Sequence, residues 1–275
     1  MMKTQRDAEA ANGFFLMETS EDVAVLRSNA NAFSVAADLK HKEALLAFFN
    51  DLSRLDSVKV LVIMSSQDKT GGEEYFDFAR KLKNCDWERE VFFKRFLNII
   101  DQLILDIVHL DKIVIHANSG NVISLLFNLS LACDYRIAAD NTTFQNLYLD
   151  VDLLPLGGGA FFLSRRLGRS KSYDVFLNQK EISAVEAMRL GIVDKVVPPD
   201  KLEEFTLMIA HRFAKKPAHS LTGIKRLLNY SLFGLKDYLK LENSELLRTI
   251  HSKEFLAKEV HPTESLPQDA GTMAN

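Results

Sequence analysis

The chain has 275 residues, of which 47% are hydrophobic and 26% charged, and its formal net charge at pH 7 is −3. These values are typical of a soluble globular protein and exclude a disordered or fibrous chain. The nearly balanced charge gives no general attraction to nucleic acid or to an anionic membrane surface, so we expect neither as a partner.

The cysteine content and the apolar runs of the sequence indicate which cellular compartment to expect. The two cysteines, Cys85 and Cys133, have a spacing that fits neither a disulfide framework nor a zinc site, so no metal is expected. The first 13 residues are polar and lack the apolar centre of a signal peptide. No segment approaches the run of about 18 apolar residues that spans a bilayer. We therefore expect a cytoplasmic protein.

The first half of the chain alternates strand-like and helix-like segments. Short apolar runs at 23–26, 58–64, 112–117 and 135–138 predict buried strands. Apolar residues at helical spacing predict helices over 36–55, 87–110 and 122–133. Strands separated by helices predict an α/β fold with a mostly parallel sheet and right-handed crossovers.

The second half is predicted to be nearly all helical. It opens with Gly157, Gly158 and Gly159, which allow the backbone to approach another surface closely. Helical segments follow at 159–167, 171–177, 183–190, 199–215 and 217–232, and Ser183 with Glu186 forms a capping box. The polar residues 256–275 have no hydrophobic period, so we expect a disordered tail there.

Three segments, in this order and spacing, resemble the enoyl-CoA hydratase/isomerase (crotonase) family. The first is Leu-Ser-Leu-Ala-Cys-Asp-Tyr-Arg-Ile-Ala at 129–138, followed by Phe144. The second is Pro155 with Gly158 and Gly159, leading to Leu-Ser-Arg-Arg-Leu-Gly at 163–168. The third is Ile-Ser-Ala-Val-Glu-Ala-Met-Arg-Leu-Gly-Ile-Val-Asp-Lys-Val-Val at 182–197. The similarity extends from about Phe14 to Leu232.

The resemblance implies an architecture and a chemistry. The fold would be the crotonase (ClpP-like) spiral of β-β-α turns, with a core over 14–197 and a helical C-terminal region over 198–255 that forms trimers, often paired into hexamers. Members bind an acyl-CoA or acyl-carrier thioester and stabilise its enolate with two backbone N–H groups. Such an oxyanion hole contributes roughly 3 kcal/mol per donor. No cofactor beyond the CoA moiety of the substrate is implied.

The family's site residues can be placed on this sequence one by one. The two oxyanion donors would be the N–H groups of Glu73, next to Gly72, and of Leu125, where the family's triple glycine is replaced. The two catalytic glutamates fall on Asn128 and Tyr148. An amide cannot take up a proton at neutral pH, and a phenol with a pKa of about 10 is a poor base. Standard hydration, which needs two proton-transfer groups, is therefore not expected.

Several other side chains are candidates for proton transfer. Asp150 and Asp152 lie near Tyr148 and would point the same way if the segment were extended; the alternative is a solvated or capping pair. Glu73 and Glu74 flank one predicted donor, although a surface role is the simpler interpretation. We interpret His116 and Cys133 as core residues rather than catalytic ones.

The CoA-binding residues are less well matched. The loop after the first strand is shorter than in the family, and it leaves Arg27 and Ala32 as candidates. Gly72, next to the predicted donor Glu73, is the third candidate for a contact with CoA. Lys225 and Arg226 are further candidates for a phosphate contact, because relatives supply a lysine from the C-terminal helices of a neighbour.

Two functions remain open. The first is an enzyme that stabilises a thioester enolate, acting as an isomerase, decarboxylase or other lyase. The second is a non-catalytic homologue that binds a CoA ester or a protein. A dinucleotide-binding dehydrogenase is excluded because no Gly-x-Gly-x-x-Gly follows the first strand. A serine hydrolase is excluded because the chain has no Gly-x-Ser-x-Gly.

Overall fold

The computed structural model describes residues 15–28, 39–64, 72–84, 89–178 and 181–257. Ala32 and residues 258–275 of the predicted tail therefore lie outside the described residues, and of Glu73 and Glu74 only the backbone is described. None of the helices in these ranges has both the length and the apolar character that crossing a membrane requires.

The main sheet has six strands in the order β1-β2-β3-β4-β6-β9. The edge pair β1–β2 is antiparallel, and every other neighbouring pair is parallel, as the sequence predicted. The strands are β1 (Phe15–Ser20), β2 (Val23–Ser28), β3 (Val60–Met64), β4 (Ile113–Asn118), β6 (Tyr135–Ala139) and β9 (Lys195–Val197).

A second, smaller sheet extends the spiral. It has the order β5-β7-β8, with β5 (Asn121–Ile123), β7 (Thr143–Gln145) and β8 (Glu181–Ser183). β4 and β6 each pass through a short turn into a strand of this sheet, and Gly120, with φ 66°, makes the first of these turns. Because α5 follows β5 directly, the chain traces the β-β-α turns that the resemblance implied.

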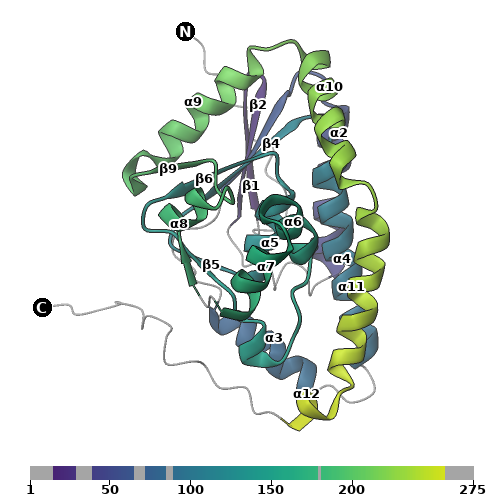
Figure 1. Ribbon diagram of the computed structural model, residues 1–275. Coiled ribbons are helices and arrows are strands. Elements are labelled where there is room, and N and C mark those ends of the chain that lie inside the picture. The colour runs from purple at the N-terminus through teal and green to yellow at the C-terminus, as the bar shows by residue number, and fades with distance from the viewer. Residues whose placement is uncertain (1–14, 29–38, 65–71, 85–88, 179–180, 258–275) are drawn as a thin grey trace, which may run out of the picture.

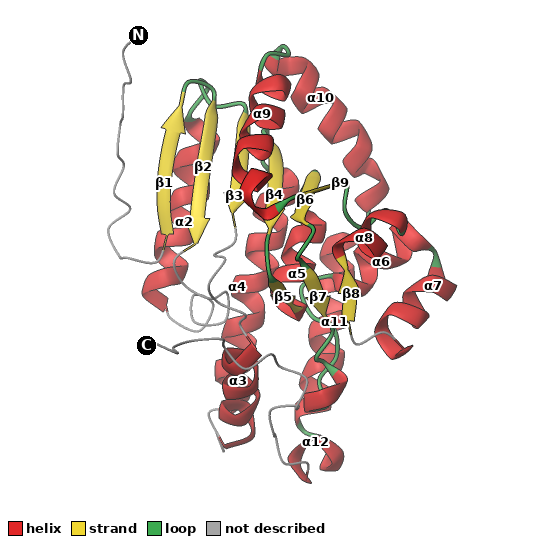
Figure 2. Cartoon of the chain, turned by 90° about the vertical axis from the view of Figure 1, so that its left-hand side faces the viewer, coloured by secondary structure: helices red, strands yellow, loops and turns green. Residues whose placement is uncertain are grey.

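Helices cover both sheets (Figures 1 and 2). Figure 1 shows α11 running alongside α4, and Figure 2 shows α9 lying across the main sheet, where it contacts β3, β4 and β6. The helices are α2 (Leu39–Arg54), α3 (Gly72–Asn84), α4 (Arg89–His109), α5 (Ser124–Ala132), α6 (Gly159–Leu167), α7 (Arg169–Tyr173), α8 (Ala184–Arg189), α9 (Leu202–Ala214), α10 (Ala218–Asn229), α11 (Leu235–Ile250) and α12 (Lys253–Ala257). Four short helical turns accompany them, namely η1 (Leu149–Val151), η2 (Asp174–Asn178), η3 (Pro199–Lys201) and η4 (Tyr230–Leu232).

The main sheet is buried on both faces, which explains its continuous apolar strands. Along β3, Val60 and Val62 pack toward α9 on one face, while Leu61 joins the larger core on the other. The larger core contains buried side chains of α4, α5, α6 and α11. These four helices surround the region where the family resemblance places the active site.

The differences from the predicted elements have local causes. The segment predicted as a helix from 122 begins with β5 instead, because residues 121–123 pair with β7. The predicted helix from 199 begins with the short turn η3, and α9 proper starts at Leu202. The predicted capping box is confirmed, since Ser183 Oγ accepts a hydrogen bond from the N–H of Glu186. Residues 256 and 257, which we expected to belong to the tail, are the last two residues of α12.

Candidate active site

Helix α5 positions two of the predicted site residues, Leu125 and Asn128. The helix is buried along nearly its whole length, so its side chains are fixed by packing on all sides. Leu125 lies in the first turn, where backbone N–H groups have no partner within the helix, and no side chain caps this end. Its N–H lies at the positive end of the helix dipole, and its role as an oxyanion donor stays a prediction.

Asn128 and Tyr148 form a buried hydrogen-bonded pair. Asn128 Nδ2 donates to Tyr148 Oη at 2.6 Å and to the carbonyl of Leu156 at 2.6 Å, and Tyr148 Oη donates to the carbonyl of Ser124 at 3.2 Å. Burial raises the pKa of the Tyr148 phenol well above its usual range. The two positions that carry glutamates in the family are thus joined to each other, and neither holds a group that takes up a proton at neutral pH.

The backbone segment of Leu156, Gly157, Gly158 and Gly159, called here the glycine turn, packs directly on α5. Gly157 and Gly158 have φ values of 71° and 75°, a left-handed conformation that favours glycine. A Cβ at Gly159 would lie 2.5 Å from Asn128 Oδ1, so only glycine fits there. The glycines predicted to allow a close approach therefore do so: Gly159 approaches Asn128, while Gly157 lies nearest to Ile100 and Gly158 to Phe162.

A carboxylate that the sequence analysis did not single out lies against the glycine turn. Glu242 of α11 is 6% exposed, and its two oxygens accept from the N–H of Gly158 at 3.0 and 3.2 Å. Burial and the negative charge of Asp101 raise the pKa of Glu242 to about 8, although the N–H of Gly158 acts in the opposite direction.

The sequence does contain a signal for Glu242. Helix α11 buries residues at a spacing of three and four, and one member of this otherwise apolar stripe is acidic. The buried residues of α11 are Leu235, Leu239, Glu242, Leu246 and Ile250. An acidic residue on the buried face of a helix is rarely found without a partner, so it is a candidate for a functional group.

A second carboxylate, Asp101, neighbours Glu242. Asp101 lies on α4, and its Oδ2 accepts from Asn243 Nδ2 at 2.6 Å. Burial raises the pKa of Asp101 to about 6, which the bond from Asn243 partly offsets. The pKa values of the two carboxyl groups are thus raised to different extents. Such a difference allows one group to be protonated and the other ionised near neutral pH.

We predicted that Asp150 and Asp152 would point the same way if their segment were extended, and the structure does not have this geometry. The segment is not extended: residues 149–151 form the 3₁₀ turn η1, and Asp152 ends it with φ 55°. In such a turn, residues two apart point in different directions. Asp152 is half-buried beside the site, and its role in proton transfer stays a prediction.

The three cationic side chains predicted to contact CoA phosphates each pair with a carboxylate of the same chain. Arg27 Nη2 lies 2.6 Å from Glu203 Oε1 and 3.8 Å from Glu18 Oε2, which joins β2 to α9. Lys225 is buried and donates to Asp134 and to the carbonyls of Ile107 and Lys112, so the predicted phosphate contact is wrong for this residue. Arg226 pairs with Asp111.

The structure places His116 and Cys133 in the core, as predicted. Both side chains are 2% exposed. Burial lowers the pKa of His116 to about 4 and raises that of Cys133 to about 12, so the imidazole is neutral and the thiol protonated at neutral pH. The other predicted backbone donor, Glu73, lies with Gly72 in the first turn of α3.

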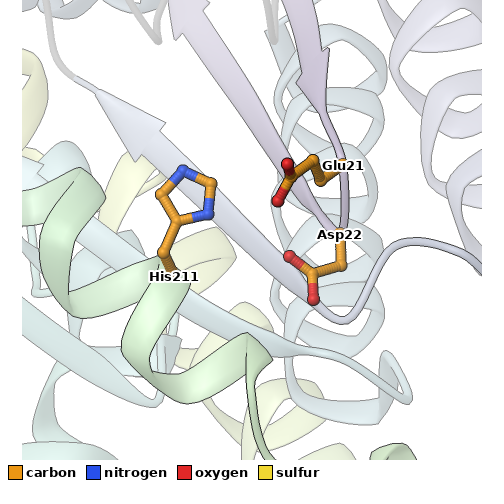
Figure 3. Close-up of side chains that lie close together, drawn as sticks. All are labelled: Glu21, Asp22 and His211. Atoms are coloured by element: carbon orange, nitrogen blue, oxygen red, sulfur yellow. The ribbon is translucent and has the colours of Figure 1, made fainter. Parts of the chain in front are cut away.

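A separate group of possible metal ligands lies between the β1–β2 turn and α9 (Figure 3). Glu21, Asp22 and His211 each bring one ligand atom within 4.8 Å of the others, and this donor set suits a divalent cation. However, Lys59 Nζ lies 3.4 Å from Asp22 and donates to the carbonyl of Ala214. The ammonium offsets the charge of Asp22, and these contacts join the turn to α9.

Comparison with known proteins identifies the family. The sequence model of the enoyl-CoA hydratase/isomerase family matches residues 18–259. A trans-2-decenoyl-[acyl-carrier-protein] isomerase of Streptococcus mutans is 26% identical over 82% of this chain and 86% of its own length. A probable enoyl-CoA hydratase, EchA17, of Mycobacterium tuberculosis is 26% identical over 73% of this chain and 72% of its own.

Solved structures agree with this assignment. The enoyl-CoA hydratase of Bacillus halodurans superposes with a TM-score of 0.74 at 19% identity, covering 88% of this chain and 97% of that one. A monofunctional enoyl CoA isomerase from M. smegmatis superposes with a TM-score of 0.62 at 24% identity, covering 80% of this chain and 94% of that one. The protein thus has the crotonase α/β fold. The chain belongs to the enoyl-CoA hydratase/isomerase family.

Proposed function

We propose that the protein is an enzyme that binds an acyl thioester, carried by CoA or by an acyl-carrier protein, and moves its double bond through a stabilised enolate. Family membership supports the thioester substrate. The relative from S. mutans, named as an isomerase acting on a carrier-bound decenoyl group, supports the reaction class.

The observation that carries this proposal is the buried pair of Asn128 and Tyr148. Adding water across a double bond needs one group to activate the water and another to protonate the α-carbon. Here both family positions are occupied by groups that take no proton at neutral pH, and they bond each other at 2.6 Å. Moving a double bond only transfers one proton between two carbons, so a single acid–base group suffices.

The stabilisation of the enolate would come from the backbone. The N–H of Leu125, in the uncapped first turn of α5, is one proposed donor, and the N–H of Glu73 is the other. Both donors belong to the main chain, so substitution of the family's glycines by side chains leaves them in place. Gly72, Arg27 and Ala32 stay the proposed contacts of the CoA moiety, and no other cofactor is proposed.

The test begins with binding. The purified protein is titrated calorimetrically with CoA, acetyl-CoA, a 3-enoyl-CoA, a carboxylated acyl-CoA and a 3-enoyl acyl-carrier protein. Each binder is then incubated, and its products are separated by chromatography and identified by mass spectrometry. We expect the 3-enoyl thioester to give its 2-enoyl isomer at unchanged mass. Loss of carbon dioxide from a carboxylated acyl-CoA would instead assign a decarboxylase. No binding of any CoA or carrier thioester would contradict the proposal.

A non-catalytic homologue is the second candidate, and one observation favours it. Leu125, Asn128 and Tyr148 are each no more than 1% exposed, and the Leu125 side chain fills space next to the glycine turn. A site closed in this way suits a protein that keeps the fold to bind a CoA ester or a protein. Binding of a thioester without turnover or proton exchange would identify this function.

We further propose a homotrimer or hexamer located in the cytoplasm. Several large apolar side chains of α10 and the segment after it are exposed on the single chain and would be covered in such an assembly. They are Ile224, Leu227, Leu228, Tyr230 and Phe233, with exposed fractions from 56% to 83%.

A further inference from the structure

Three metal-ligating side chains lie together where the β1–β2 turn meets α9, on elements other than those of the candidate active site (Figure 3). Glu21 and Asp22 form the two-residue turn between Ser20 and Val23, which pair with each other across the hairpin. Figure 3 shows the two carboxylates and the imidazole of His211 facing one another. The fold thus brings ligand-type side chains together from two segments that are far apart in the sequence.

The spacing of the three side chains fits a metal ion. One possible ligand atom from each lies within 4.8 Å of the other two. Nitrogen and oxygen ligands lie about 2.0–2.2 Å from Zn²⁺, so two ligands of one ion are at most about 4.4 Å apart. Shifts of about 1 Å or less would therefore bring all three atoms to a common ion.

These ligands are not occupied by other contacts in the part of the chain that the structure describes. There, the Glu21 carboxylate and the His211 imidazole have no hydrogen-bond or ion-pair partner and do not bond each other. Asp22 contacts Lys59 through Oδ2, at 3.4 Å, and the Lys59 ammonium lies closer to the carbonyl of Ala214, at 2.8 Å. Lys59 therefore offsets one of the two carboxylate charges, and the other remains to attract a cation.

Both segments that carry the ligands are fixed by the fold. The carbonyl of Asp22 accepts from the N–H of Lys59 at 2.8 Å, which ties the turn to the start of β3. On α9, Ile209 and Ala210 precede His211 and are buried against the main sheet. Ligands on such rigid segments are held near their binding positions before an ion arrives.

We propose that Glu21, Asp22 and His211 bind a divalent transition-metal ion, for which Zn²⁺ is the best fit, and that this ion joins the β1–β2 turn to α9. An imidazole in the ligand set favours zinc, nickel or copper over Mg²⁺ and Ca²⁺, which prefer oxygen ligands alone. Three protein ligands leave the fourth tetrahedral position to water, which the exposure of Glu21 allows.

The ion would have a structural role, because no residue proposed for the thioester reaction belongs to this site. The expectation of no metal rested on the spacing of the two cysteines, and the site uses neither of them.

The test uses Zn²⁺ alone, with chelator-treated protein from which any histidine tag has been removed, because a tag binds the same ions. The wild type, His211→Ala, Glu21→Gln and His219→Ala are titrated calorimetrically, and their melting temperatures are measured with and without Zn²⁺. His219→Ala is the matched control, since His219 is exposed on α10 and lies outside the cluster. The melting temperatures without Zn²⁺ show that each variant is folded.

We expect the wild type to bind one Zn²⁺ per chain and to melt at a higher temperature in its presence, because an ion bound only by the folded state stabilises that state. His211→Ala should bind about 100-fold more weakly or less, since even a residue that only orients a metal ligand contributes about 10–100-fold. Glu21→Gln should weaken binding by about 10-fold or more. His219→Ala should match the wild type.

Three results would overturn the inference. They are a wild type that binds no Zn²⁺, binding that His211→Ala retains, and binding that His211→Ala loses but Glu21→Gln keeps at full strength. The last result would assign adventitious binding to a single surface histidine. None of these measurements depends on thioester turnover, so this inference and the proposed function stand or fall separately.

Discussion

Gly159 lies against Asn128 with no room for a side chain, which limits the residue at this position to glycine. A Cβ at Gly159 would lie 2.5 to 2.6 Å from three atoms of the Asn128 side chain, which is itself fully buried. We expect Gly159→Ala to lower the free energy of unfolding by about 1–3 kcal/mol, because the core must shift to accept the methyl group. Urea unfolding measures this difference.

Gly223 provides the matched control for that substitution. It lies inside α10, and a Cβ there would meet no atom within 4 Å. Gly223→Ala should therefore leave stability unchanged or raise it by about 0.5–1 kcal/mol, since alanine favours a helix interior. Equal losses in the two variants would show that the close approach to Asn128 is not the cause.

Glu242 should also make stability depend on pH. Its pKa in the folded protein, about 8, is raised above the ordinary value of 4.5, so between these values the folded state binds more protons than the unfolded state. Stability should therefore decrease as pH rises through this window. Urea midpoints at mildly acidic and mildly alkaline pH should differ more in the wild type than in Glu242→Gln. An equal difference in both proteins would contradict the raised pKa.

At the scale of elements, Lys225 fastens α10 to the body of the protein. Its ammonium is 2.8 Å from Asp134 Oδ2 and donates to the carbonyls of Ile107, at the end of α4, and Lys112, just before β4. Replacing it leaves the largely buried carboxylate of Asp134 without its ion-pair partner. We expect Lys225→Met to reduce the free energy of unfolding by about 3–5 kcal/mol.

A surface lysine serves as the control for Lys225. Lys240 on α11 pairs with Asp237 at 3.0 Å, and both side chains are largely exposed. Lys240→Met should change the free energy of unfolding by less than about 1 kcal/mol, as is usual for exposed ion pairs. If Lys225→Met were equally mild in urea unfolding, the anchoring role of Lys225 would be wrong.

How far the sequence predicts the elements depends on their length and burial. β3 and β4 are buried on both faces, so their apolar runs identify them. β5, β7 and β8 have three residues each, too few to display an alternating pattern, and they went unpredicted. Helix α3 was not predicted either, although its buried residues Tyr75, Phe76, Ala79 and Leu82 follow helical spacing.

The residues of the candidate site likewise divide into those that the sequence predicted and one that it did not. Asn128 and Tyr148 follow from the resemblance, since a motif of fixed spacing places them, and the structure brings them into contact. Glu242 lies 84 residues beyond Gly158, and only the folding of α11 back onto the core brings the two together. A short sequence motif cannot predict such a long-range contact. The acidic residue in the otherwise apolar buried face of α11 was the one sequence feature that indicated it.

At the scale of the whole molecule, the exposed apolar side chains of α10 and the segment after it favour self-association. Leu227 and Phe233 are 78% and 83% exposed on the single chain. We expect light scattering after size-exclusion chromatography to give the mass of a trimer or hexamer, and Leu227→Asp to shift it toward the monomer. A monomeric wild type at micromolar concentration would contradict the proposed assembly.

The central claim is that this family member moves a double bond without adding water. The most direct test saturates the protein with a 3-enoyl thioester and, separately, with its 2-enoyl isomer, on CoA and on an acyl-carrier protein. The products are separated by chromatography, which resolves the two isomers, and their masses are then measured. We predict interconversion of the two isomers at unchanged mass, with no product that has gained one water. Accumulation of a hydrated thioester as the main product would contradict the account, because the pair of Asn128 and Tyr148 provides no base for that reaction.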